Sequence, residues 1–213
     1  YLVFIDFEDA YTTVPHDMLL AVLSAMGLHH SIIAVIRKLL VVSLYAVTWY
    51  GPTWSWRISK GLLQGGVCSC KLFNLMLEAL CRKICTRIAG VTLTEGQTVK
   101  ILAWADDLCI VCKDRNEVNA VTEELNKWRR ITGMRTNISG VSKTAIASLI
   151  FTGSNTEAKS DTRNKFYLQQ CDGSRAKIPM LSPSQRYNYL GYKLSMSSDP
   201  TAHHKEGKAQ IAK

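Results

Sequence analysis

The segment ILAWADDLCIV, residues 101–111, places two adjacent acids, Asp106 and Asp107, inside an otherwise apolar run. Apolar runs of this kind favour buried strands, whereas a buried carboxylate without a partner is strongly disfavoured. Both demands are met if two strands form a tight hairpin with the acids at its tip. The chain therefore has to form a hairpin that carries negative charge at one edge of a sheet. Taken alone, the acids could be ordinary turn residues.

A third acid, Asp6, ends the apolar stretch YLVFID. Acids at strand ends can meet at one edge of a sheet, where two charges about 4 Å apart cost about 4 kcal/mol at an effective dielectric of about 20. One acid would take up a proton unless a cation neutralised the group. Carboxylate oxygens suit Mg²⁺, and two such ions about 4 Å apart stabilise both oxygens of a phosphoryl transfer. The three acids therefore predict a metal-dependent site.

Apolar periodicity and turn residues along the rest of the chain predict a mixture of helices and strands. Helices are expected over residues 16–26, 31–40, 67–88 and 114–133. Strands are expected over residues 1–7, 99–104, 108–113, 143–151 and 187–194, with a hairpin over 45–58. This order predicts an α+β domain in two layers, with a largely antiparallel sheet.

Helix caps and polar segments mark the boundaries of these elements. Ser31 is expected to cap the second helix, and Asp114 with Glu117 has the spacing of a capping box. Residues 154–172 are polar and predict a mobile insertion or linker. Residues 195–213 predict a mobile polar tail.

The net charge of +9 suggests a polyanionic partner, nucleic acid first and an acidic membrane second. No membrane span is expected, because Arg37 and Lys38 interrupt the apolar run 31–50 before the roughly 20 apolar residues that a spanning helix needs. Two groups of cations could contact phosphate or simply favour helix C-termini. They are Arg82, Lys83 and Arg87, and Lys127, Arg129, Arg130 and Arg135.

The seven cysteines, in a chain without a signal peptide, indicate a reducing compartment rather than a disulfide framework. Cys109 and Cys112 have a C-x-x-C spacing, which raises the possibility of a zinc site. They lie in a strand-like run, where their odd spacing sends them to opposite faces, so we expect core thiols.

Five motifs, in order from Tyr1 to about Leu194, together resemble one family. They are FIDFEDAYTTVPHDMLL, GLLQGGVCSCKLFNLMLE, WADDLCIV, GMRTNISGVSKT and YNYLGYKL. In this order they resemble the reverse transcriptase domain of non-LTR (LINE-type) retrotransposons, with group II intron enzymes as more distant relatives. The resemblance implies a polymerase palm over residues 1–194, with a ferredoxin- or RRM-like antiparallel sheet packed on helices and part of the fingers.

The resemblance also implies a reaction and its catalytic residues. An RNA-directed DNA polymerase joins a dNTP to a DNA primer 3′-hydroxyl on an RNA template, with two Mg²⁺ ions for which Mn²⁺ can substitute. Asp6, Asp106 and Asp107 would be the catalytic acids, and the backbone carbonyl of Phe7 would join them in holding the metals.

Nucleotide and primer contacts follow from the same motifs. Tyr11 would discriminate the sugar, Gln64 and Gly65 would shape the nucleotide pocket, and Lys143 would lie near the triphosphate. The primer end would be held by Tyr189, Leu190 and Gly191.

The chain departs from the family pattern at several positions. Trp104 replaces a Tyr, Thr12 an Asp, Gly66 a Ser and Cys70 a Pro, and Asn137 stands further from Lys143 than the pattern has it. An alternative is therefore a catalytically inactive nucleic-acid-binding remnant of a retrotransposon, and a third possibility is another two-metal enzyme such as a nucleotide cyclase.

The chain opens at Tyr1 in mid-strand, which suggests a piece of a longer protein. The rest of the fingers, the thumb and any endonuclease would lie outside it. A nuclear location would follow if the element is eukaryotic. The sequence leaves the oligomeric state open.

Overall fold

A computed structural model describes residues 1–42, 44–47, 54–93, 96–140, 143–148, 150–152, 155–157, 163–170, 172–182 and 185–195. The chain divides into two compact units. The sheet unit comprises Tyr1–Asp6, Ile84–Asn126 and the described residues from Thr136 onward. The helical unit comprises Phe7–Lys83 and Lys127–Arg135.

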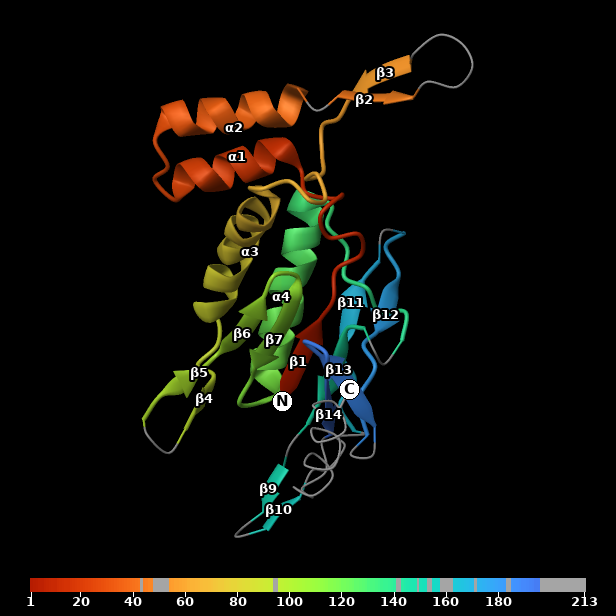
Figure 1. Ribbon diagram of the computed structural model, residues 1–213. Helices are drawn as coiled ribbons and strands as arrows, with labels where there is room; N and C mark the ends of the chain where they lie inside the picture. Colours follow the sequence, from red (N-terminus) through yellow and green to blue (C-terminus); the bar gives the residue numbers. More distant parts are fainter. Residues whose placement is uncertain are drawn as a thin grey trace, which may run out of the picture. The chain divides into compact units, whose positions relative to one another are not determined.

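The sheet unit is built on a four-stranded sheet in the order β6-β7-β1-β8 (Figure 1). The strands are β6 (Ile101–Trp104), β7 (Asp107–Val111), β1 (Leu2–Ile5) and β8 (Ala145–Ala147). All three pairings are antiparallel. Phe4, Cys109 and Ala145 lie in register across the strands β1, β7 and β8 and are buried, so the apolar runs of the sequence form the core as expected.

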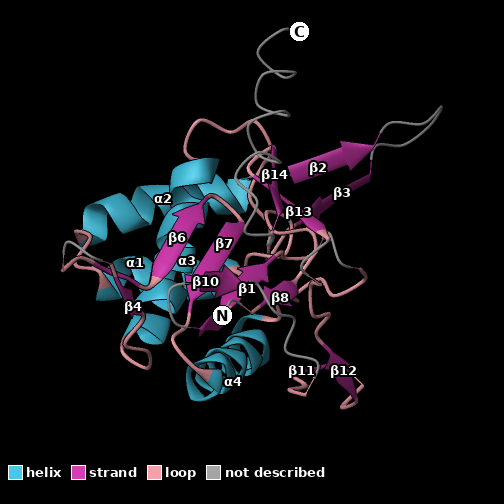
Figure 2. Cartoon of the chain, turned by 90° about the horizontal axis from the view of Figure 1, so that it is seen from below, coloured by secondary structure: helices cyan, strands magenta, loops and turns pink. Residues whose placement is uncertain are grey.

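Helix α4 (Arg115–Thr132) covers one face of this sheet (Figure 2). Its residues Val118, Val121 and Leu125 are buried. The Oδ1 atom of Asp114 accepts a hydrogen bond from the Glu117 amide at 3.0 Å, which confirms the predicted cap. The α+β class with antiparallel sheets is therefore confirmed.

Four two-stranded hairpins complete the sheet unit. They are β4 (Val91–Thr92) with β5 (Thr98–Val99), β9 (Ile150–Thr152) with β10 (Asn155–Glu157), β11 (Tyr167–Gln169) with β12 (Arg175–Lys177), and β13 (Arg186–Tyr189) with β14 (Tyr192–Ser195). The strands β4, β10, β11 and β12 were not predicted.

Two predictions for this C-terminal part were wrong. Residues 187–194 form a hairpin rather than one strand, because Leu190 and Gly191 both have positive φ, 52° and 80°, the geometry of a tight two-residue turn. The segment 154–172 is not simply a linker, since β11 lies within it and Phe166 is buried. The predicted tail over 196–213 lies outside the described residues.

The helical unit contains two antiparallel helices, α1 (His16–Ala25) and α2 (His30–Val42), seen at the top of Figure 1. The hairpin of β2 (Leu44–Val47) and β3 (Trp54–Arg57) confirms the pair predicted over 45–58, although its tip lies outside the described residues. Helix α3 (Ser69–Cys85) begins in this unit. None of the helices in the described part of the chain has the length and apolarity to cross a membrane.

The predicted cap at Ser31 was wrong. Helix α2 starts one residue earlier, at His30, so Ser31 lies in its first turn. The Ser31 amide donates a long hydrogen bond of 3.4 Å to Nδ1 of His29, which takes the position expected for the cap.

Candidate functional site

The β6–β7 hairpin brings its two acids to the end of the central strands. Trp104 pairs with Asp107, so the turn consists of Ala105, with a φ of 51°, and Asp106. Asp107 is the first residue of β7 rather than a turn residue. Because Ile5 pairs with Leu108 in antiparallel register, the next positions, Asp6 and Asp107, lie side by side at the same edge. The structure therefore brings the three predicted acids together.

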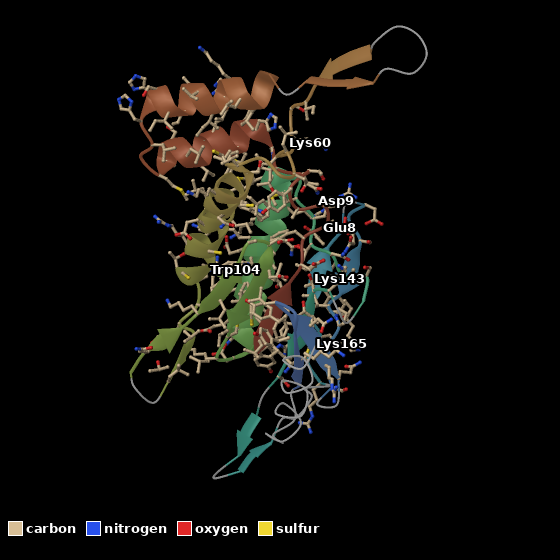
Figure 3. All side chains as sticks on the ribbon, in the orientation of Figure 1. Glu8, Asp9, Lys60, Trp104, Lys143 and Lys165 are labelled. Atoms are coloured by element: carbon tan, nitrogen blue, oxygen red, sulfur yellow. The ribbon has the colours of Figure 1, made fainter. Side chains whose placement is uncertain are left out.

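Electrostatics at this edge reflect the crowding of negative charge. Burial raises the pKa of the Asp107 carboxyl, and the neighbouring charges of Asp106 and then Asp6 raise it further, while Lys143 lowers it. Lys143 places its Nζ atom 3.5 Å from Oδ2 of Asp6, in a partly exposed ion pair. Figure 3 labels Lys143 beside the sheet. Lys143, which was assigned to the nucleotide, thus belongs to the same cluster as the acids.

The backbone of Asp6 is held by a residue that sequence reasoning missed. The Asp6 amide donates to the hydroxyl of Thr144 at 3.1 Å, and that hydroxyl lies 3.3 Å from the Asp6 carbonyl oxygen. The Asn137 amide also donates to this carbonyl, at 2.7 Å. Thr144 is fully buried at the start of an apolar strand. A lone polar residue at that position is the signal that could have indicated its role.

The β13–β14 hairpin is fixed to the sheet by two tyrosines. The Tyr187 ring stacks on Phe4 with ring centroids 4.1 Å apart, and its hydroxyl donates to the Lys143 carbonyl oxygen at 2.7 Å. The Tyr189 hydroxyl donates to the Leu102 carbonyl oxygen at 3.2 Å. Burial is the main cause that raises the pKa of Tyr189 to about 12, so this hydroxyl remains a donor at neutral pH.

Two of the predicted primer-binding residues therefore form the tip of a firmly anchored hairpin. Leu190 and Gly191 are exposed there, while Tyr189 packs against the sheet. The sequence had placed all three in one continuous strand. The tight turn instead places Leu190 and Gly191 at the exposed tip of the hairpin.

Asp6, Asp106 and Asp107 together form what we call the acid edge. Its side chains are of the right chemical type to bind a divalent cation, but they are not arranged around a common point. Carboxylate oxygens are the ligands that Mg²⁺ prefers. The pKa of Asp107 is raised first by burial and then by the charges of Asp106 and Asp6, and a cation would relieve this repulsion. Within the described residues, however, no three His, Cys, Asp or Glu side chains are arranged to hold a metal. The predicted tight cage was therefore not found. Its side chains repel one another, and Asp6 is paired with Lys143.

The other predicted site residues belong to the helical unit. Phe7 is buried, and Tyr11 stacks on the buried Phe73 with centroids 4.7 Å apart. The Tyr11 carbonyl accepts from the Leu62 amide at 2.8 Å. Gly61 has a φ of 99°, and a Cβ there would lie 2.9 Å from the Thr12 carbonyl oxygen, so only glycine allows this approach. These contacts join the Tyr11 segment to the loop 61–66.

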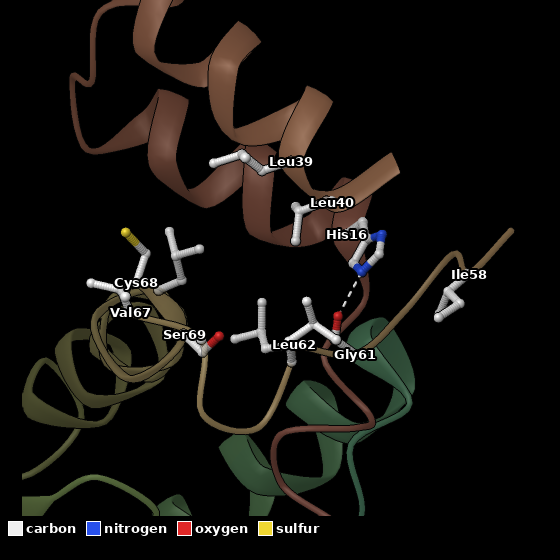
Figure 4. A pocket seen from close by; sticks show the side chains of 12 residues that line it. His16, Leu39, Leu40, Ile58, Gly61, Leu62, Val67, Cys68 and Ser69 are labelled. Carbon is white, nitrogen blue, oxygen red and sulfur yellow. Dashed lines mark hydrogen bonds between the residues drawn. The ribbon is translucent and has the colours of Figure 1, made fainter. Parts of the chain in front are cut away.

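Gln64 and Gly65 are exposed at the tip of that loop. Gly65 has a φ of 83°, and no atom lies within 4 Å of a Cβ built there. The turn therefore explains this glycine, and the space beside it is open. A cavity of about 270 Å³ lies behind the loop (Figure 4), mostly apolar, with His16 Nε2 2.7 Å from the Gly61 carbonyl oxygen.

Some of the predicted phosphate-binding cations have partners within the protein. Arg87 pairs with Glu124 and Glu123, each at 2.9 Å, and Arg82 pairs with Glu78 at 2.7 Å. The pairs of Arg87 attach the chain after α3 to helix α4, whereas the pair of Arg82 lies within α3. The sequence could not show this, because Arg87 and its partners are far apart in the chain.

The cysteines of the C-x-x-C spacing are core thiols, as expected. Cys109 and Cys112 are both buried, and burial raises the pKa of each thiol to about 12. Protonated thiols of this kind are poor metal ligands. The structure therefore gives no support to a zinc site here.

Comparison with known proteins identifies a family to which this sequence is similar. The sequence matches the profile of the family described as "Reverse transcriptase (RNA-dependent DNA polymerase)" over residues 1–194. No curated protein matches the sequence. Among solved structures, the fold is similar to apo telomerase from Candida tropicalis truncated from its C-terminal domain, with a TM-score of 0.50 and 12% identity. The match covers 66% of this chain but only 31% of that one.

Proposed function

The chain belongs to the reverse transcriptase (RNA-dependent DNA polymerase) family, and we propose that its acid edge catalyses RNA-directed DNA synthesis. The observation that carries the proposal is the register of β1 and β7. It sets Asp6 beside Asp107 and leaves Asp106 in the adjoining turn. Three carboxylates gathered at the end of β1, at the start of β7 and in the turn before it can bind the metal ions that nucleotidyl transfer needs.

Each acid has a separate task in this proposal. Asp6 and Asp106, with the backbone carbonyl of Phe7, hold the divalent cations, and Asp107 supports them. Two bound Mg²⁺ ions, or Mn²⁺ in their place, supply charge stabilisation for the attacking and leaving oxygens. Thr144 positions Asp6 through its backbone and is not itself in contact with the reaction.

The remaining residues bind the substrates. Lys143, whose ammonium group lies beside Asp6, faces the triphosphate of the dNTP and can supply a proton to the leaving pyrophosphate. In the helical unit, Tyr11 discriminates the sugar, and Gln64 with Gly65 shapes the nucleotide pocket. Tyr189, Leu190 and Gly191 hold the DNA primer end on the anchored hairpin.

The wider assignment follows from the resemblance of the motifs. We infer that residues 1–194 are a palm with part of the fingers, from a non-LTR retrotransposon product. Such a product acts in the nucleus if the element is eukaryotic. The template is RNA, the primer is DNA, and residues 195–213 lie beyond the domain.

Primer extension on an RNA template with Mg²⁺ tests the proposal. The variant Asp106→Asn removes one charge from the acid edge, and we expect a loss of activity of at least about 10³-fold, in line with the loss of a group that stabilises the transition state. Asp9→Asn is the matched control. It makes the same chemical change at an exposed residue outside the group of three acids, and we expect activity close to that of the unaltered chain.

Equal activity of Asp106→Asn and Asp9→Asn would overturn the catalytic assignment. Extension by any longer chain that includes the flanking regions counts equally as support. The two variants also need the same affinity for RNA, so that the loss is assigned to the chemical step.

The second candidate function is a nucleic-acid-binding remnant without turnover. It is favoured by Trp104, which replaces the family's Tyr beside the acids and is 70% exposed. Figure 3 labels this side chain. The pairing of Asp6 with Lys143 points the same way. Salt-sensitive RNA binding without extension, in every chain length tested, would establish this function instead.

A further inference from the structure

The hairpin β11–β12 has one apolar face and one basic face. Residues Leu168 and Ala176 oppose each other on the inner face, and Leu168 is buried. On the outer face Tyr167 stands opposite Lys177, and Gln169 stands opposite Arg175. Because side chains alternate along a strand, the basic and aromatic residues all point away from the core.

The hairpin is held on the sheet unit by its inner face and its ends. The buried Phe166 packs edge-to-face on Tyr1, with ring centroids 5.9 Å apart. Its carbonyl accepts from the Ile178 amide at 2.9 Å, and the Gln169 amide donates to Oδ1 of Asn126 at 2.9 Å. Its outer face is therefore presented in a fixed orientation.

The outer face carries three cations that have no ion-pair partner in the described part of the chain. Lys165, Arg175 and Lys177 are exposed, and none of the three forms an ion pair with a residue in the described part of the chain. Asp172, in the turn between the two strands, accepts a hydrogen bond from the Ser174 amide at 2.9 Å. An ordinary solvated surface would mix both signs of charge.

We propose that this face, formed by Lys165, Tyr167, Arg175 and Lys177, binds an unpaired nucleic-acid strand. The three cations contact successive phosphates, and the Tyr167 ring, 42% exposed, stacks on a base. The proposal rests on the proposed function for its partner, since a polymerase of this family has a template strand that must be held before it is copied.

The aromatic residue favours a single strand over other polyanions. Stacking needs a base that is not already paired and stacked, which a single strand offers and a duplex does not. An anionic membrane would engage the cations but has no partner for Tyr167. A template RNA and a single-stranded DNA share this chemistry, so the experiment has to compare the two.

Fluorescence anisotropy with labelled single-stranded RNA, single-stranded DNA and a blunt duplex, over a range of salt, tests the proposal. The double variant Arg175→Gln/Lys177→Gln removes two phosphate contacts. We expect affinity for single strands to fall on the order of tenfold, and the slope of log K against log salt to become shallower by about 1.4. A larger loss of affinity for single-stranded RNA would identify a template RNA as the partner. A larger loss for single-stranded DNA would identify a DNA strand.

Tyr167→Ala tests stacking separately. We expect about 5- to 100-fold weaker binding to single strands with an unchanged salt slope. Tyr167→Phe keeps the ring and should bind as the unaltered chain does. Thermal unfolding shows whether the alanine variant is folded. If it is not, the double variant Arg175→Gln/Lys177→Gln still tests binding to single strands.

Arg37→Gln/Lys38→Gln is the matched control for charge. It removes the same charge from exposed positions of helix α2 and should leave the salt slope unchanged. Equal losses in both double variants would reduce the effect to net charge and overturn the proposal. Binding to phosphatidylserine vesicles but not to single strands would overturn it too.

Failure of this proposal can be told apart from failure of the proposed function. Asp106→Asn should bind RNA as the unaltered chain does while losing extension. The hairpin variants should raise KM for the template and leave kcat unchanged. Extension with unaltered KM in the hairpin variants would reject the surface and leave the catalytic assignment intact.

Discussion

The sheet unit carries two hairpins of opposite charge. The acid hairpin, β6–β7, forms one side of the sheet and ends in Asp106 and Asp107. The basic hairpin, β11–β12, lies beyond β8 on the opposite side, as Figure 2 shows. Strand β7 is buried between two neighbours, whereas β11 pairs only with β12.

The difference shows that the two kinds of charge need different support. Carboxylates that act on a reacting phosphate must be held within a fraction of an ångström, about 0.5 Å, and the buried strand β7 provides that support. Contacts to a sugar-phosphate backbone tolerate small movements, and a hairpin anchored by one face is sufficient. The hairpin with the acids is thus the more rigidly held of the two, and the hairpin with the cations the less rigidly held.

A matched pair of leucines gives the largest expected effect. Leu108 of the acid hairpin and Leu168 of the basic hairpin are 1% and 3% exposed. We expect Leu108→Ala to lower the free energy of unfolding by about 4–5 kcal/mol and Leu168→Ala by about 2–3 kcal/mol, because a peripheral hairpin can close part of the cavity. Urea unfolding measures both. Equal losses would remove the proposed difference in rigidity.

The next effect concerns the support of the acid edge. Thr144→Val keeps the shape of the side chain but removes the hydroxyl that contacts the Asp6 backbone, and we expect a loss of about 1–3 kcal/mol. Thr144→Ser keeps the hydroxyl and should lose less. Hydrogen exchange at the Asp6 amide should speed up only in the valine variant. Unchanged exchange there would mean that Thr144 does not position Asp6.

The smallest effect comes from the charges themselves. The pKa of Asp107 is higher in the folded chain than its usual 3.8, so the folded chain binds more protons between those two pKa values and loses stability as the pH rises through them. Asp107→Asn, in metal-free buffer, should therefore raise the free energy of unfolding at neutral pH by up to about 1 kcal/mol after solvent screening. The gain should vanish below pH 3.8.

Asp172→Asn on the basic hairpin is the control for this change. Asp172 accepts a hydrogen bond from the Ser174 amide within the turn, so its neutralisation weakens a favourable contact and should give no gain at any pH. Chemical denaturation of both variants across the pH range makes the comparison. A gain in both would show that the effect is not specific to the crowded acids.

The sequence by itself determined the chemistry and the local elements. The acids in apolar runs predicted strand ends and a hairpin, and apolar spacing predicted the helices, because each of these patterns acts over a few neighbouring residues. The motifs in order also indicated the reverse transcriptase family, which the match over residues 1–194 confirmed.

Only the tertiary structure decided which distant residues meet. Thr144 contacts Asp6 across 138 residues, Lys143 pairs with that same acid, and Arg87 is neutralised by α4 rather than by phosphate. The turn at Leu190 and Gly191 and the strand β11 were misjudged for the same reason. Pairing between strands is a long-range choice that propensity leaves open, and it is settled by which faces can be buried together.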